Sequence, residues 1–310
     1  MPLDPEIEAA FFGESLDDAP AFALGVAESR AAEYEFIELC GPAEPVASVV
    51  DRTVPVDGGE IGVRIYTPEG TGPFPCLVYF HGGGWVAGDL NTMDRPCRTF
   101  ANGAGCVVVS VDYRCAPEHK FPTAADDSYA AAKWVADNAA ELGIDPSRIA
   151  LGGDSAGGNL TAVVSQMARD KGGPDIAFQL IIYPVIDFSF DTPSYHEVGE
   201  GYGLTTPMME WFWEQYLSDP AHGANPYASP IRASSLAGLP PAAVFVAGYD
   251  PLRDEGIAYG EALRAAGGTV DVRRLDTMVH GYLQMGAVSA GARRAVADTV
   301  AALRDGLSPR

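Results

Sequence analysis

From about residue 46 onward, short apolar runs rich in β-branched residues alternate with stretches of helical composition. This alternation is typical of a mostly parallel sheet whose two faces are both covered by helices. The chain has 310 residues, 47% of them hydrophobic, which is enough apolar material for one large domain of this kind. We therefore expect an α/β fold built on a mostly parallel central sheet.

The apolar runs are the expected strands, and the expected helices lie between them. The strands should cover residues 62–67, 76–80, 106–111, 148–152, 179–183, 243–247 and 269–275. The helices should cover residues 123–142, 156–171, 254–266 and roughly 286–307. Residues 5 to about 40 are acidic with scattered apolar positions, and this pattern predicts one or two short helices.

One segment, from Asp187 to about Pro220, interrupts the alternation. It has no strand pattern but is dense in aromatic and methionine side chains, and residues 206–217 are expected to be helical, with Thr205 or Thr206 as N-cap. Such insertions usually lie over the carboxyl ends of the strands, where ligands bind. We interpret the segment as a cap; the alternative is that its aromatics only attach a helix to the core.

The expected organisation therefore has four parts. Residues 1–45 form N-terminal helices that join the cap, residues 46–187 and 221–310 form the two parts of the core, and residues 188–220 form the cap insertion. No internal repeat or low-complexity linker divides the chain.

The strongest chemical signal is the sequence GDSAG at residues 153–157, which follows an expected strand and precedes an expected helix. In this context a G-x-S-x-G sequence forms a sharp turn that projects the serine hydroxyl above the sheet. Glycine is needed on both flanks because side chains there would collide with neighbouring elements. Ser155 is therefore the candidate nucleophile; the alternative is a plain glycine-rich turn.

A second signal is HGGGW at residues 81–85, directly after the expected strand over residues 76–80. Its glycines expose backbone N–H groups to an approaching oxygen, which suits an oxyanion hole formed by the amides of Gly83, Gly84 and Ala156. Three glycines could instead hold a phosphate, but such a loop needs a basic partner, and the neighbours here are acidic.

A serine hydroxyl attacks esters only when a base is adjacent, and that base needs an orienting carboxylate. Among the five histidines, His280 is the candidate base because it follows the last expected strand. His81 is expected to hold the glycine loop in shape. Three other histidines do not follow the last expected strand and are therefore less suited to act as the base: His119, His196 and His222.

The orienting carboxylate should follow the preceding strand, and Asp250 lies at the end of the strand over residues 243–247. Asp254 and Glu255 fall in the first turn of the next helix, where stabilisation of the helix dipole would explain them. Asp276 is the other contender, four residues before His280. We favour Asp250 because the order Ser155, Asp250, His280 is the order of this arrangement on α/β sheets.

These motifs together resemble the bacterial hormone-sensitive-lipase-like (family IV) esterases of the α/β-hydrolase superfamily. The resemblance covers nearly the whole chain, from about residue 5 to the end. It rests on HGGGW (81–85), YRCAPEHKFP (113–122), GDSAGGN (153–159), NPYASP (225–230), YDPLRDE (249–255) and HGY (280–282). It implies an α/β-hydrolase core with a helical cap, no cofactor, and hydrolysis of short-to-medium acyl esters through an acyl-enzyme on Ser155.

Apolar side chains near these motifs are candidates for the acyl pocket, although each could equally belong to the core. They are Trp85, Tyr183, Leu204, Met208, Trp211 and Phe212. Two other functions stay open at this point. An amidase or peptidase could use the same residues, and a ligand-binding receptor could occupy the same scaffold, although that function would predict a lost catalytic residue.

The formal net charge of −22 makes nucleic-acid binding and attachment to anionic membranes unfavourable. No run of 18 apolar residues predicts a membrane span, and the acidic N-terminus does not resemble a signal peptide. The five cysteines form no C-x-x-C pair and no pattern of metal ligands, so we expect reduced structural thiols and no metal. A cytoplasmic monomer or homodimer acting on a small-molecule ester is the resulting expectation.

Overall fold

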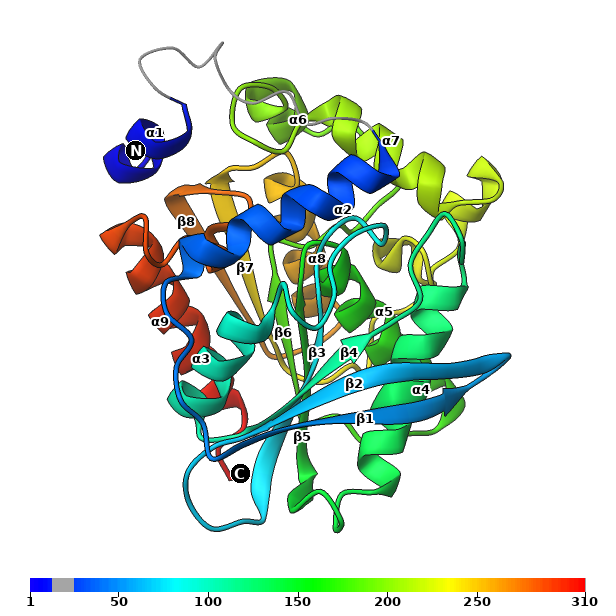
Figure 1. Cartoon of the computed structure of the whole chain (residues 1–310). Coiled ribbons are helices and arrows are strands. Elements are labelled where there is room, and N and C mark those ends of the chain that lie inside the picture. Colours follow the sequence, from blue (N-terminus) through cyan, green and yellow to red (C-terminus); the bar gives the residue numbers. More distant parts are fainter. Residues whose placement is uncertain (13–24, 310) are drawn as a thin grey trace.

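The computed structural model describes residues 1–12 and 25–309. Its centre is an 8-stranded sheet in the order β1-β2-β4-β3-β5-β6-β7-β8 (Figure 1). The strands are β1 (Ser48–Val56), β2 (Gly59–Thr67), β3 (Phe74–Phe80), β4 (Val107–Asp112), β5 (Ile144–Asp154), β6 (Phe178–Ile182), β7 (Ala242–Tyr249) and β8 (Val270–Val279). β2 pairs antiparallel with β1 and β4, and every pairing from β4 to β8 is parallel. This is the α/β-hydrolase architecture that the sequence predicts.

Helices cover both faces of the sheet. α3 (Asp94–Ala104) and α9 (Ala290–Gly306) lie against one face, and α4 (Thr123–Asp137), α5 (Ala156–Lys171) and α8 (Arg253–Ala265) lie against the other (Figure 1). Because consecutive side chains of a strand point to opposite faces, each central strand contributes to two cores. In β3, Val78 packs with the residues of α4 and α5, whereas Leu77 packs with those of α3 and α9.

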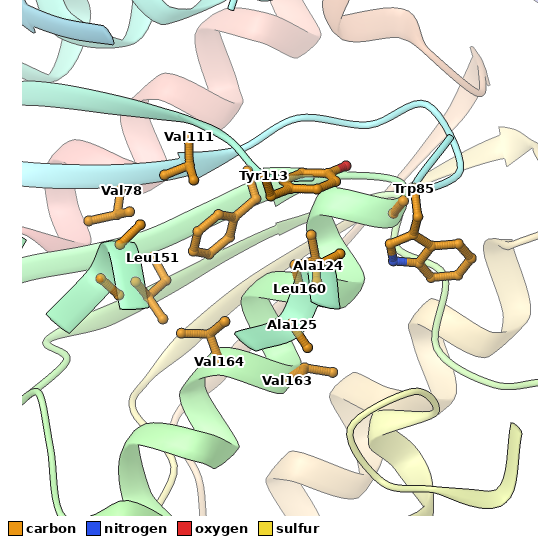
Figure 2. Packing of buried hydrophobic residues seen from close by; sticks show 14 of the residues in the cluster. Val78, Trp85, Val111, Tyr113, Ala124, Ala125, Leu151, Leu160, Val163 and Val164 are labelled. Atoms are coloured by element: carbon orange, nitrogen blue, oxygen red, sulfur yellow. The ribbon is translucent and has the colours of Figure 1, made fainter. Parts of the chain in front are cut away.

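Figure 2 shows the core between the sheet and α5. Val78, Val111 and Leu151 project from three strands toward Leu160 and Val164 of α5, and all five side chains are fully buried. This packing fixes α5 against the sheet, and it therefore fixes the turn between β5 and α5 that carries Ser155.

Four further helices lie outside these two layers: α1 (Pro5–Phe11), α2 (Val26–Glu35), α6 (Pro193–Val198) and α7 (Thr206–Tyr216). Figure 1 shows α2, α6 and α7 together at one end of the sheet, with α2 crossing in front of it. The connections include the short 3₁₀ helices η2 (Phe36–Cys40), η3 (Pro220–Ala224), η4 (Pro230–Arg232) and η5 (Tyr282–Gln284). α7 begins after Thr205, whose side chain accepts a hydrogen bond from the Met208 amide at 3.3 Å.

The structure contains elements that the sequence analysis did not predict, among them β1 and α3. β1 is an additional strand; most of its residues are exposed at the edge of the sheet, so it lacks the apolar pattern of a buried strand. α3 is an additional helix, and it contains Pro96 in its first turn and Gly103 near its end, which are residues typical of turns. The expected helix over residues 123–142 ends earlier, at Asp137.

Within the described residues, no helix combines the length and the apolar character needed to cross a lipid bilayer.

Candidate active site

Ser155 lies in the turn between β5 and α5, with φ 55° and ψ −118°. A non-glycine residue at this φ is strained, and the surrounding structure must hold it there. The Ser155 amide donates to the Ile182 carbonyl at 2.9 Å, and the Ser155 carbonyl accepts from the Val185 amide at 3.2 Å. These bonds attach the turn to the end of β6 and to the segment that follows it.

The glycines of this turn are required by close packing. A Cβ atom on Gly157 would overlap the Phe80 carbonyl oxygen at the end of β3, and one on Gly153 would overlap the Gly157 carbonyl. The turn is therefore packed so tightly against β3 that only glycine fits at both positions.

Ser155, His280 and Asp250 form a continuous hydrogen-bonded chain. The Nε2 atom of His280 lies 3.0 Å from the Ser155 hydroxyl oxygen, and its Nδ1 atom lies 2.8 Å from the Asp250 carboxylate. Asp250 follows β7 directly and is fully buried, and its other oxygen accepts from the Leu252 amide at 2.9 Å. His280 follows β8 directly, and its ring centroid lies 4.6 Å from that of Tyr183.

The other candidate carboxylates have different partners. Asp276 forms an ion pair with Arg274 at 2.6 Å, and Asp254 forms one with Arg253 at 2.7 Å. Glu255 accepts a hydrogen bond from the Ile186 amide at 2.7 Å. Among the described carboxylates considered from the sequence, Asp250 alone bonds to His280.

Among the described residues, none of the remaining histidines bonds to Ser155. His119 and His222 are exposed, and His196 pairs with exposed Asp191 at 2.8 Å. His81 is fully buried, with its ring stacked on Tyr113 at 4.2 Å between centroids. Burial lowers the pKa of His81 to about 4, so the ring is neutral at neutral pH.

The HGGGW loop begins at the end of β3, beside the nucleophile turn. Gly83 and Gly84 have φ values of 95° and 60°, which favour glycine. A Cβ atom on Gly84 would overlap the ring of Phe212 in α7. Helix α7 therefore lies in contact with this loop, and Ala156 begins α5 on the other side of Ser155.

Asp154 connects the two motifs, a role that the sequence analysis did not assign. Its carboxylate accepts from the Gly82 amide at 3.0 Å and from the Tyr79 hydroxyl at 2.6 Å. Burial raises the pKa of Asp154, and these two donors act against that shift. Its position immediately before Ser155 in the glycine-flanked turn was the available signal in the sequence. Its partners, Tyr79 of β3 and Gly82 after β3, become visible only once β3 and β5 are paired in the sheet.

The structure places Trp85 in the core, and this changes one predicted assignment. Its indole is fully buried, stacked on Tyr216 at 4.1 Å and close to Trp213 at 4.7 Å between centroids. Protein side chains occupy the surroundings of this ring, so Trp85 attaches α7 to the glycine loop. We therefore remove Trp85 from the candidate pocket lining.

The other candidate pocket residues lie after β6 and in or just before α7. Tyr183 follows β6, is buried beside His280, and has φ 33°. Leu204 is buried just before α7, and three residues of α7 itself are partly buried: Met208, Trp211 and Phe212.

Among the described residues, no group of three or more histidine, cysteine, aspartate or glutamate side chains is arranged to hold a metal ion.

Comparison with known proteins agrees with this geometry. Residues 77–284 match the family described as alpha/beta hydrolase fold. The chain is 43% identical over 314 residues to the carboxylic ester hydrolase LipN of Mycobacterium tuberculosis, covering 99% of this chain and 84% of that protein. It is 36% identical to an ethyl acetate hydrolase of Pseudomonas putida, covering 93% of this chain and 92% of that protein.

A solved structure of a hyperthermophilic esterase from the archaeon Pyrobaculum calidifontis superposes with a TM-score of 0.91 at 41% identity. The superposition covers 98% of this chain and 99% of that one. The chain therefore belongs to the α/β-hydrolase fold family, within its hormone-sensitive-lipase-like (family IV) branch.

Proposed function

We propose that this protein is a serine carboxylesterase that hydrolyses short-to-medium acyl esters through an acyl-enzyme on Ser155. The observation that carries the proposal is the bonded chain from the Ser155 hydroxyl through His280 to buried Asp250. Carboxylic ester hydrolysis is also the activity named for relatives that match nearly the whole chain.

In the proposed mechanism, the Ser155 oxygen attacks the ester carbonyl carbon while His280 Nε2 accepts the hydroxyl proton. The tetrahedral intermediate collapses, the alcohol leaves with the proton from His280, and an acyl ester remains on Ser155. Water then attacks this ester with His280 again as base, which releases the carboxylic acid and restores the serine. Asp250 holds the imidazole in the required tautomer and stabilises its protonated form.

We propose the amides of Gly83, Gly84 and Ala156 as donors to the oxyanion of the intermediate. The glycine loop and the start of α5 lie on either side of Ser155, and the hydrogen bond from Gly82 to Asp154 holds the loop against the turn. Each donor of this kind typically contributes about 10²–10³ in rate.

The cap supports the proposed limit on substrate size. We assign residues 188–220 and the N-terminal helices of residues 1–45 to the cap, and residues 46–187 and 221–310 to the core. Phe212 of α7 lies against Gly84, so apolar cap residues border the proposed oxyanion hole. We propose that the acyl chain contacts Tyr183, Leu204, Met208, Trp211 and Phe212.

Two further proposals concern the whole chain. All five cysteines are free thiols, which supports a location in the reducing cytoplasm. β8 lies at one edge of the sheet, so a homodimer through this edge is an alternative to a monomer. Cell fractionation and light scattering, respectively, test these two points.

Hydrolysis of p-nitrophenyl esters from acetate to palmitate, by the wild type and by Ser155→Ala, tests the function. The wild type should be most active on short or middle chains, and the variant should lose about 10⁶-fold in kcat. Retained activity in folded Ser155→Ala, or a maximum at palmitate, would contradict the proposal.

A further inference from the structure

Helix α2 is attached to the loop that follows the proposed oxyanion glycines. The Arg30 guanidinium donates to the Val86 carbonyl at 3.0 Å and to the Ala116 carbonyl at 3.2 Å, and it forms a two-point ion pair with Glu118. One turn further along α2, the Tyr34 hydroxyl donates to Asp89. The side of α2 that carries residues 30 and 34 therefore faces the loops that contain Val86, Asp89 and Ala116. The helix itself crosses the end of the sheet at which α6 and α7 also lie (Figure 1).

Glu33 lies on that same side of α2. Residues three and four positions apart share a helix face, so Glu33 is grouped with Arg30 and Tyr34. Its side chain is partly buried, in contrast to exposed Glu35 two residues later. Within the part of the chain that the structure describes, the Glu33 carboxyl has neither a hydrogen-bond partner nor an ion-pair partner.

Charged groups of the candidate active site act on the Glu33 carboxyl. Its pKa is raised to about 7, first by burial and then by the charges of Asp154 and Asp89, while His280 acts in the opposite direction. The charge of Glu33 in turn acts on the buried hydroxyls of Tyr183 and Tyr113. His280 is the member of the proposed triad whose charge acts on Glu33, and no lysine or arginine among the described residues forms an ion pair with this carboxylate.

We propose that Glu33 is a specificity-determining residue that favours esters carrying a positive charge close to the scissile group. A carboxylate without a partner, partly removed from water, attracts a cation more strongly than an exposed one does. The ring of Phe212, which is partly buried and lies against Gly84 of the proposed oxyanion hole, suits a quaternary ammonium group by cation–π attraction. This inference rests on the proposed esterase function.

Pairs of substrates with the same shape but different charge test the inference. Acetylcholine and 3,3-dimethylbutyl acetate differ by a positive charge on the alcohol side. Ethyl 4-(trimethylammonio)butanoate and ethyl 5,5-dimethylhexanoate differ in the same way on the acyl side. The quantity of interest is the charge ratio, defined as kcat/KM for the cationic ester divided by kcat/KM for its neutral partner. Any general loss of activity in a variant cancels in this ratio.

Glu33→Gln should lower the charge ratio by about tenfold for at least one pair, because the variant keeps the shape and removes the charge. Glu35→Gln is the matched control: it makes the same chemical change on the exposed side of α2 and should leave the ratio unchanged. A charge ratio that is equal in the wild type and in Glu33→Gln for both pairs would overturn the inference.

The pH dependence of the ratio provides a second readout. As Glu33 ionises near pH 7, the wild-type ratio should rise between about pH 6 and pH 8, whereas the Glu33→Gln ratio should stay flat. A rise of equal size in both proteins would assign the effect to another group and contradict the inference.

The outcomes for the two claims are distinguishable. If the enzyme hydrolyses neither neutral ester nor any p-nitrophenyl ester, the proposed function fails. If it hydrolyses the neutral esters and the charge ratio does not respond to Glu33→Gln, only the role of Glu33 fails.

Discussion

Asp250, Asp254 and Glu255 lie within one short stretch of chain, yet each bonds to a different group. Asp250 bonds to His280, Asp254 to Arg253, and Glu255 to the Ile186 amide. The difference follows from position: Asp250 ends the strand segment, whereas the other two belong to the first turn of α8. At the residue scale, the proposed role of a carboxylate is therefore decided by which element it ends or begins.

Replacement of Asp250 should show whether Asp250 or Asp276 is the carboxylate that orients His280. Asp250→Asn should lower kcat by about 10⁴-fold, because the amide no longer holds the imidazole in the required tautomer. Asp276→Asn is the matched control and should change kcat by less than about threefold, since Asp276 pairs with Arg274. Steady-state kinetics on one p-nitrophenyl ester measures both. The reverse pattern would assign the carboxylate role to Asp276.

At the scale of elements, the site depends on how closely the β5–α5 turn and the helices α2 and α7 approach the glycine loop. Gly157 leaves no space for a side chain beside Phe80, and Phe212 of α7 leaves none beside Gly84. Arg30 attaches α2 to the segment after the same loop. The loop is thus held between the turn on one side and the helices α2 and α7 on the other.

Addition of one methyl group at Gly157 tests the contact between the β5–α5 turn and Phe80. Gly157→Ala should lower the free energy of unfolding by about 3 kcal/mol and abolish activity, because its Cβ would overlap backbone atoms that have no room to move. Gly59→Ala is the control, since no atom lies within 4 Å of its Cβ position. Denaturant unfolding of both variants gives the comparison; equal stability would show that the turn can relax.

Removal of the Arg30 contacts tests the attachment of α2. Arg30→Gln should increase the hydrogen-exchange rate of α2 amides by about tenfold and reduce kcat/KM by a smaller factor, because the helix loses bonds to two carbonyls and to Glu118. Arg52→Gln, at an exposed position of β1, is the control. Unchanged exchange in α2 would mean that other contacts hold the helix.

At the scale of the whole molecule, the net charge of −22 implies repulsion among carboxylates that the fold must tolerate. Asp112, at the end of β4, is one carboxylate on which such repulsion acts. Burial, and then the charge of Asp89, raises the pKa of Asp112 to about 6, and Arg64 acts in the opposite direction. The ionised form is therefore disfavoured in the folded state relative to the unfolded chain.

The sign of this shift gives a stability prediction. A carboxyl whose pKa is higher in the folded state destabilises the fold fully above about pH 6, and this cost disappears as the pH falls toward the unfolded value. Asp112→Asn should therefore raise the free energy of unfolding by about 1 kcal/mol at about pH 8 and leave it unchanged at about pH 4. Asp305→Asn, at an exposed position of α9, is the control. Denaturant unfolding at both pH values measures the effect, and a destabilised Asp112→Asn at the higher pH would contradict it.

Much of this site could be predicted from the sequence because Ser155, Asp250 and His280 each directly follow a strand with a clear apolar pattern. The edge strand β1 could not be predicted, because its exposed residues lack the apolar pattern of a buried strand. The burial of Trp85 depends on the approach of α7, which is distant in the chain. Glu33 lies in an acidic helix without a motif, so its position beside the site becomes visible only when α2 is placed on the core.

The most direct test of the account is to identify the residue that becomes covalently modified by a fluorophosphonate. This reagent phosphonylates an activated serine and releases fluoride, so its site of attachment is found by peptide mass spectrometry. We predict one adduct, on the peptide that contains Ser155, absent in Ser155→Ala and formed much more slowly in Asp250→Asn. An adduct on another residue, or no adduct in a folded protein that hydrolyses esters, would contradict the assignment of Ser155 as the nucleophile.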